Sequence, residues 1–221
     1  MLLTCARLWL PLAHKINAYL ESPMSEPKTL LQMAGVESIP AAWDDSVLIM
    51  IDCQREYTDG GLPLSGVDAA LDAGAKLLAL ARSQGAPVIH VQHLGRAGGL
   101  FDPDGEMFAL CAAVAAETGE AIVTKALPNA FAGTDLADKL AASGRKSIIV
   151  AGFMTHMCVS STARAALDQG YGCTVVADAC ATRDLPDGAG GVISADALHR
   201  AELAALADRF AIVVGDATAW D

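Results

Sequence analysis

Short apolar runs of strand length recur along this chain, and each but the last is followed by a segment with helical periodicity. Continuous apolar runs are typical of strands that are covered on both faces, as in a parallel sheet. The alternation therefore predicts an α/β fold, a three-layer α/β/α Rossmann-like sandwich with a six-stranded, mainly parallel sheet. The expected strands span residues 47–51, 87–91, 121–124, 147–151, 173–177 and 211–214, and the expected helices span 68–84, 106–116, 134–143, 156–169 and 195–209.

Glycines mark the ends of three of these helices. Gly85, Gly144 and Gly170 each follow a helix and precede the next strand. A left-handed helix cap is least costly for glycine, so these positions support the helix boundaries. In an open sheet of this kind, ligands bind outside the carboxyl ends of the strands, near the switch in strand order.

The length of 221 residues, 53% of them hydrophobic, is enough for one substantial core. We expect one domain over residues 41–221, preceded by an N-terminal extension over residues 1–40 that carries no chemistry. Within the extension, residues 1–23 differ in character from the rest. Their apolar stretch 8–13 is short and contains Pro11, which argues against a signal peptide.

Charge and cysteine content narrow the class of partner. The formal net charge is −11, from 15 basic and 26 acidic residues, so a nucleic-acid partner is not expected. No apolar run is long enough to cross a membrane. The six cysteines form no C-x-x-C pair and no zinc-ligand spacing, which favours reduced thiols and a cytoplasmic protein. A small-molecule ligand fits these properties.

Cys158 is the first candidate for chemistry, because an apolar strand leads through a tight turn to this residue at the expected start of a helix. Unpaired amides and the positive end of the helix dipole both favour a thiolate, so we expect a pKa below the ordinary value of about 8.5. The alternative is that Cys158 is a small apolar core residue, since free cysteines are often buried.

Two charged residues follow other strands at the same sheet edge. Asp52 ends the apolar run 47–51, and Lys125 follows the run 121–124. Taken singly, Asp52 could hydrogen-bond its own loop and Lys125 could be solvated. Together, an ammonium beside a carboxylate and a thiol is an arrangement that a cysteine nucleophile requires.

With these motifs the chain resembles the isochorismatase-like cysteine hydrolases, a family that includes nicotinamidases and N-carbamoylsarcosine amidases. The resemblance covers about residues 44–216 and assigns a hydrolase domain of that type to residues 41–221. It rests on a strand ending Ile-Asp-x-Gln (Asp52, Gln54), a Lys-x-x-x-x-Ala-Phe-x-x-Thr-x-Leu stretch (Lys125, Phe131, Thr134, Leu136) and a Gly-x-x-Thr-x-x-Cys-Val-x-x-Thr-Ala-Arg-x-Ala stretch (Gly152, Thr155, Cys158, Thr162, Arg164).

The resemblance implies a catalytic triad in which Cys158 is the nucleophile, Asp52 the acid and base, and Lys125 the third member. It also implies a cis peptide at Phe153–Met154 and an oxyanion hole made by the backbone amides of Met154 and Cys158. The reaction would then cleave a C–N amide bond of a small molecule through a thioester on Cys158. No cofactor is expected. The segment 88–95 lacks the Asp-x-His metal motif of many nicotinamidases, so no metal is expected either.

Gln54, Tyr57, Phe101 and Phe131 are candidates for the substrate pocket because their loops leave the same sheet edge, and His93, at the end of the second strand, is a further candidate. For His93 the alternative is a packed core histidine. The family also implies a homo-oligomer. The competing functional hypothesis is a non-catalytic small-ligand binding or interaction protein with the same fold. A dinucleotide-dependent oxidoreductase is not expected, because no Gly-x-Gly-x-x-Gly turn follows the first strand.

Overall fold

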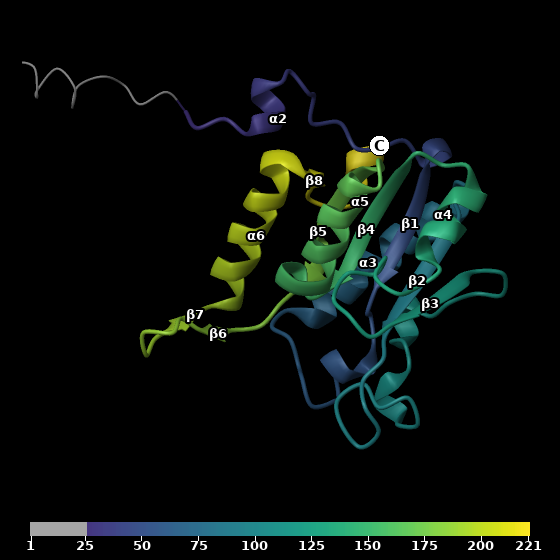
Figure 1. Cartoon of the computed structure of the whole chain (residues 1–221), viewed down its shortest axis with the longest axis vertical. Coiled ribbons are helices and arrows are strands. Elements are labelled where there is room, and N and C mark those ends of the chain that lie inside the picture. The colour runs from purple at the N-terminus through teal and green to yellow at the C-terminus, as the bar shows by residue number, and fades with distance from the viewer. Residues whose placement is uncertain (1–25) are drawn as a thin grey trace, which may run out of the picture.

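The computed structural model describes residues 26–221, so the expectation for residues 1–23 lies outside the described residues. Its centre is a six-stranded sheet with the strand order β3-β2-β1-β4-β5-β8, in which every neighbouring pair is parallel (Figure 1). The fold class predicted from the sequence is confirmed. The strands are β1 (Ser46–Ile51), β2 (Val88–His93), β3 (Ala121–Lys125), β4 (Ser147–Phe153), β5 (Gly172–Ala181) and β8 (Ile212–Val214).

Helices cover both faces of this sheet. One face packs against α3 (Val67–Ser83), and the other packs against α4 (Leu136–Ser143), α5 (Ser160–Asp168) and α6 (Ala195–Arg209). The short elements are the helix α2 (Leu30–Met33), a π-helical turn η5 (Thr155–Val159), the hairpin β6 (Leu185–Pro186) and β7 (Val192–Ile193), and the 3-10 turns η1 (Trp43–Asp45), η2 (Arg55–Tyr57), η3 (Glu106–Phe108), η4 (Ala112–Val114) and η6 (Ala217–Trp220).

The central strand β1 shows why its sequence is apolar throughout. All six of its residues are buried. Leu48 and Met50 point into the core beneath α3, whereas Val47, Ile49 and Ile51 point into the core beneath α4, α5 and α6. Side chains of a strand alternate between faces, so a strand that is covered on both sides needs an unbroken apolar run.

The chain changes direction across the sheet at β1. It runs outward from β1 to β2 and β3, and then returns to place β4 on the other side of β1. The carboxyl ends of β1 and β4 therefore flank the switch in strand order, where such folds bind ligands. The chain segments that follow these two strands carry Asp52 and Cys158.

The six predicted strands are all present, and β5 extends four residues beyond its predicted end. The glycine caps are also confirmed, since Gly85, Gly144 and Gly170 have φ angles of 64°, 70° and 83°. The domain boundary at residue 40 stays a prediction.

The helix predicted over residues 106–116 was wrong. Only the short turns η3 and η4 form there, and the backbone between them is extended. It pairs with the chain after β1, because Arg55 N donates to Ala109 O at 2.9 Å and Cys111 N donates to Cys53 O at 2.8 Å. Tertiary hydrogen bonding overrides the helical tendency of this alanine-rich segment.

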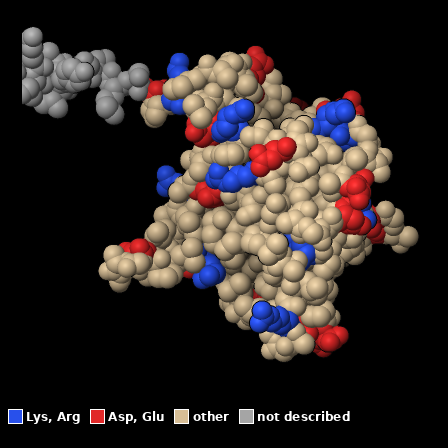
Figure 2. All heavy atoms as spheres, in the orientation of Figure 1, with Lys and Arg blue, Asp and Glu red and all other residues tan. Residues whose placement is uncertain are grey.

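On the face shown in Figure 2, acidic and basic side chains are interspersed, and this face carries no continuous basic surface. Among residues 26–221, no helix combines the length and the hydrophobicity that a membrane crossing needs.

An ion-pair network at the amino end of β3 gives a test of stability. Glu120 accepts from Arg82 Nε at 2.8 Å and contacts the buried His90 Nε2 at 2.9 Å. The hydrogen bonds from Arg82 lower the pKa of Glu120 to about 2, against the opposing effect of burial. We expect Glu120→Gln to reduce the free energy of unfolding by about 2 kcal/mol at pH 7.

Because the folded pKa of Glu120 is depressed, its contribution is present above the ordinary value of 4.5 and is lost as the pH falls toward about 2. Urea unfolding at pH 7 and at pH 3 measures this. An equal difference between wild type and variant at both pH values would contradict it.

Candidate active site

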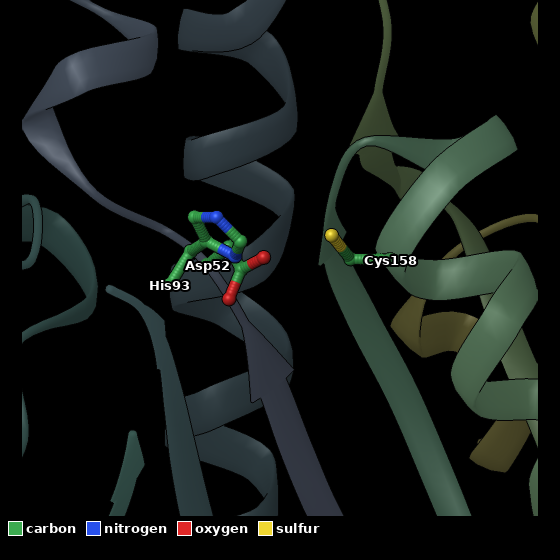
Figure 3. A group of neighbouring side chains, drawn as sticks. All are labelled: Asp52, His93 and Cys158. Atoms are coloured by element: carbon green, nitrogen blue, oxygen red, sulfur yellow. The ribbon is translucent and has the colours of Figure 1, made fainter. Parts of the chain in front are cut away.

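Four strands deliver the candidate groups to one edge of the sheet. Asp52 follows β1 directly, with a φ of 50°, and its amide donates to Val91 O at 2.8 Å. Lys125 is the last residue of β3 and lies in register with His93, the last residue of β2. Cys158 lies in η5, just after β4. Figure 3 shows Asp52 and His93 side by side, with the sulfur of Cys158 facing them.

The ammonium of Lys125 joins these groups. Its Nζ lies 2.7 Å from Asp52 Oδ2, 3.3 Å from Cys158 Sγ and 3.2 Å from His93 Nδ1. A carboxylate oxygen of Asp52, a ring nitrogen of His93 and the sulfur of Cys158 also lie within 4.8 Å of one another. The side chains of Lys125 and Asp52 are fully buried. The structure therefore brings the three residues predicted to form the triad into one buried cluster, with His93 as a fourth member.

Burial dominates the proton affinities in this cluster. It raises the pKa of Asp52, and the charge of Lys125 offsets part of that rise. Burial and the negative charge of Asp52 raise the pKa of Cys158 to about 12, against the effect of Lys125. The expected low thiol pKa was wrong. Desolvation and a neighbouring carboxylate outweigh the helix terminus, and the turn at Cys158 is π-helical rather than the start of α5.

A thiol of this kind is not ionised near neutral pH. The neighbouring carboxylate, with its raised pKa, is a suitable acceptor for the thiol proton, and Lys125 supplies a fixed positive charge beside both groups. The cluster can therefore generate a thiolate at the moment of attack rather than store one.

The turn that carries Cys158 is held at its start by hydrogen bonds to two other elements. Thr155 Oγ1 lies 3.1 Å from Ala181 O and 2.8 Å from Nδ1 of His199 on α6. His156 Nδ1 lies 2.6 Å from Thr182 Oγ1. These contacts connect the turn to the end of β5 and to α6.

Gly152, just before the turn, allows β4 to lie close to β1. It has a φ of 120°, and a Cβ at this position would lie 2.0 Å from Ile51 O. Only glycine fits there. The Phe153–Met154 peptide bond is cis, as the family resemblance implied. The oxyanion hole formed by the amides of Met154 and Cys158 stays a prediction.

Of the residues predicted to line the pocket, Gln54 has a different environment. It is fully buried, and its amide nitrogen donates to His93 O at 3.1 Å and to Phe108 O at 2.9 Å. Its Oε1 accepts from His93 N at 2.7 Å. Both amide hydrogens are used, so Gln54 fixes the end of β2 to the following loop instead of offering a donor to a ligand.

For Tyr57 and Phe131, a place in the substrate pocket stays a prediction. Tyr57 is buried between Phe101 and Phe153, with ring centroids 5.1 and 5.7 Å away. Phe131 is half-buried and packs against the core cluster that contains Cys158.

The sequence reasoning did not identify His199 or Thr182 as supports of the turn. Neither residue stood out in the sequence, because a histidine on a helix and a threonine after a strand are ordinary residues there. A pairing of Thr155 with His199 depends on how α6 packs, which a sequence pattern does not show.

Comparison with known proteins agrees with this fold. The isochorismatase domain model matches residues 46–218. The chain is 38% identical over 183 residues to the secreted isochorismatase effector Isc1 of Verticillium dahliae, covering 82% of this chain and 94% of that protein. It is 34% identical over 154 residues to maleamate amidohydrolase of Pseudomonas putida, covering 62% and 72%.

Solved structures show the same similarity. An isochorismatase from Pseudomonas putida KT2440 superimposes with a TM-score of 0.83 at 45% identity, covering 87% of this chain and 98% of that one. The fold and these matches thus define an isochorismatase-like hydrolase with a three-layer α/β/α fold. The chain belongs to the isochorismatase family, and it is an enzyme of the hydrolase class.

Proposed function

We propose that the protein is a cysteine amidohydrolase that cleaves the C–N bond of a small amide through a thioester on Cys158. The observation that carries the proposal is the position of the Lys125 ammonium, in hydrogen-bond contact with both Asp52 and Cys158 inside the protein. Relatives named maleamate amidohydrolase and streptothricin hydrolase support a hydrolase of this type.

In the proposed reaction, Asp52 accepts the thiol proton as the sulfur of Cys158 attacks the amide carbonyl. The amides of Met154 and Cys158 would stabilise the oxyanion. Asp52 then returns the proton to the leaving nitrogen, and ammonia or an amine departs from the thioester. Asp52, again a carboxylate, next deprotonates a water molecule that attacks the thioester, and the carboxylic acid and the free thiol are released.

Lys125 keeps the cluster neutral overall while the proton moves. Its positive charge offsets the carboxylate of Asp52 in the resting site and the thiolate of Cys158 during attack. Because the side chains of Lys125 and Asp52 are fully buried, the attraction between their charges is stronger than it would be in water.

The test is a panel of small primary amides and carbamoyl compounds, with ammonia release as the readout. Maleamate and its saturated analogue succinamate belong in the panel. For the best substrate, mass spectrometry after acid quenching should find an acyl adduct on the peptide that contains Cys158. If stoichiometric iodoacetamide labels several thiols equally and no amide is turned over, the alternative of a non-catalytic binding protein is supported instead.

Two further properties belong to the same proposal. We expect a cytoplasmic protein, since the five cysteines of the described part of the chain are all free and buried, although one relative is named a secreted effector. We also expect a homo-oligomer, which sedimentation or size-exclusion chromatography with light scattering measures.

A further inference from the structure

His93 touches the candidate triad, yet the proposed reaction gives it no part. Its Nδ1 lies 3.2 Å from Lys125 Nζ. An ammonium has three hydrogens to donate and cannot accept a hydrogen bond. The three neighbours of Lys125 are Asp52, Cys158 and His93, so each takes one hydrogen, and Nδ1 of His93 must be the acceptor.

This contact fixes the proton of the imidazole ring. When Nδ1 accepts, a neutral histidine carries its hydrogen on Nε2. Neutrality follows from the surroundings, because burial and the charge of Lys125 lower the pKa of His93 to about 4. Near neutral pH, His93 is therefore the neutral tautomer with hydrogen on Nε2.

The backbone that carries this ring is also held in place. The backbone N–H of His93 donates to Gln54 Oε1 at 2.7 Å, and its carbonyl accepts from Gln54 Nε2 at 3.1 Å. The imidazole lies edge-on to Phe101, with ring centroids 5.1 Å apart. A donor that is fixed in this way loses little entropy when it binds a ligand.

The second ring nitrogen of His93, Nε2, has no partner in the described part of the chain. Within residues 26–221 it makes no hydrogen bond, and it is not among the buried polar atoms that lack a partner. His93 is half-buried, so its Nε2 keeps some exposure to solvent. Figure 3 shows the ring beside Asp52. By contrast, His90 on the same strand is fully buried and pairs with Glu120.

We propose that His93 positions Lys125 through Nδ1 and donates a hydrogen bond from Nε2 to a second oxygen of the substrate, so that the enzyme prefers amides carrying a further carbonyl or carboxyl oxygen near the scissile amide. This inference rests on the proposed amidohydrolase function and deepens it by naming the substrate class.

One test compares two amides that differ in this oxygen, succinamate and butyramide. The wild type should favour succinamate in kcat/KM. His93→Phe, which fills the same space without either nitrogen, should slow both amides because Lys125 loses an acceptor. It should cost succinamate about a further tenfold, the equivalent of one hydrogen bond. His93→Gln is the matched control, since its amide can accept from Lys125 and donate to substrate, and it should keep most of the preference.

Equal losses for the two amides in His93→Phe would overturn the inference. So would a wild type that turns over both amides equally and forms the Cys158 adduct, and in that case the proposed function would stand. Absence of turnover and of any adduct would instead refute the proposed function, and the inference with it.

Nuclear magnetic resonance gives a second, independent readout that needs no substrate. The ¹⁵N shifts of the His93 ring at pH 7 should show hydrogen on Nε2 and none on Nδ1. An imidazolium, or hydrogen on Nδ1, would overturn the inference whatever the kinetics show.

Discussion

Cys158→Ala should abolish turnover, with a fall in kcat of at least about 10⁴-fold, because the sulfur is the only group proposed to form a bond to substrate. The fold should remain, since the side chain is small and its loss removes little buried surface. Ammonia release under substrate saturation measures the activity, and thermal unfolding measures the fold.

Cys173 offers a matched control for this variant. It is a second buried cysteine in the same core cluster as Cys158, but it lies on β5. Cys173→Ala should lose a similar amount of stability and keep turnover within a few-fold of the wild type. Full activity in Cys158→Ala would remove the basis of the proposed function.

Among the single substitutions proposed, Lys125→Met should cause the largest loss in the free energy of unfolding. It removes the ammonium but leaves the carboxylate of Asp52, which is fully buried and already has no hydrogen bond to Oδ1. An isolated buried charge is costly, so we expect a loss of about 3–5 kcal/mol in the free energy of unfolding at pH 7. We also expect turnover to fall by about 10³-fold, since no charge remains to stabilise the thiolate.

The pH dependence of that loss identifies its cause. Burial already raises the pKa of Asp52, and removal of Lys125 raises it further. A raised pKa in the folded state favours the protonated form, so the variant is least affected at low pH and loses stability as the pH rises through the folded pKa. Urea unfolding should therefore show a smaller difference from wild type at pH 4 than at pH 7.

A double variant separates the charge from the packing. Asp52→Asn combined with Lys125→Met removes both charges and should recover part of the stability lost in Lys125→Met alone. A double variant that is less stable than Lys125→Met would show that the unpaired carboxylate is not the source of the loss.

The sequence could predict the positions of Asp52, Lys125 and Cys158 because each lies just after an apolar run of strand length. Parallel strands end at a common edge, so three such residues had to lie near one another. The pattern of apolar runs separated by helical segments also sufficed to predict the sheet and the helices α3 to α6.

Other features depend on tertiary contacts that a local pattern does not contain. The alanine-rich segment 106–116 reads as a helix until the extended chain at residues 109–111 pairs with the chain after β1. The pKa of Cys158 depends on how deeply the turn is buried, and a motif does not give depth. The role of Gln54 likewise required the position of the β2 carbonyl groups.

The pairing of β2 with β3 places His93 directly opposite Lys125, so enzymatic activity depends on the correct alignment of these two strands. A slip of β3 by a single residue would turn the ammonium to the opposite side of the sheet, away from both the carboxylate and the sulfur. Recovery of turnover during refolding would consequently time the correct alignment of an outer strand, an event that helix content measured by circular dichroism does not detect.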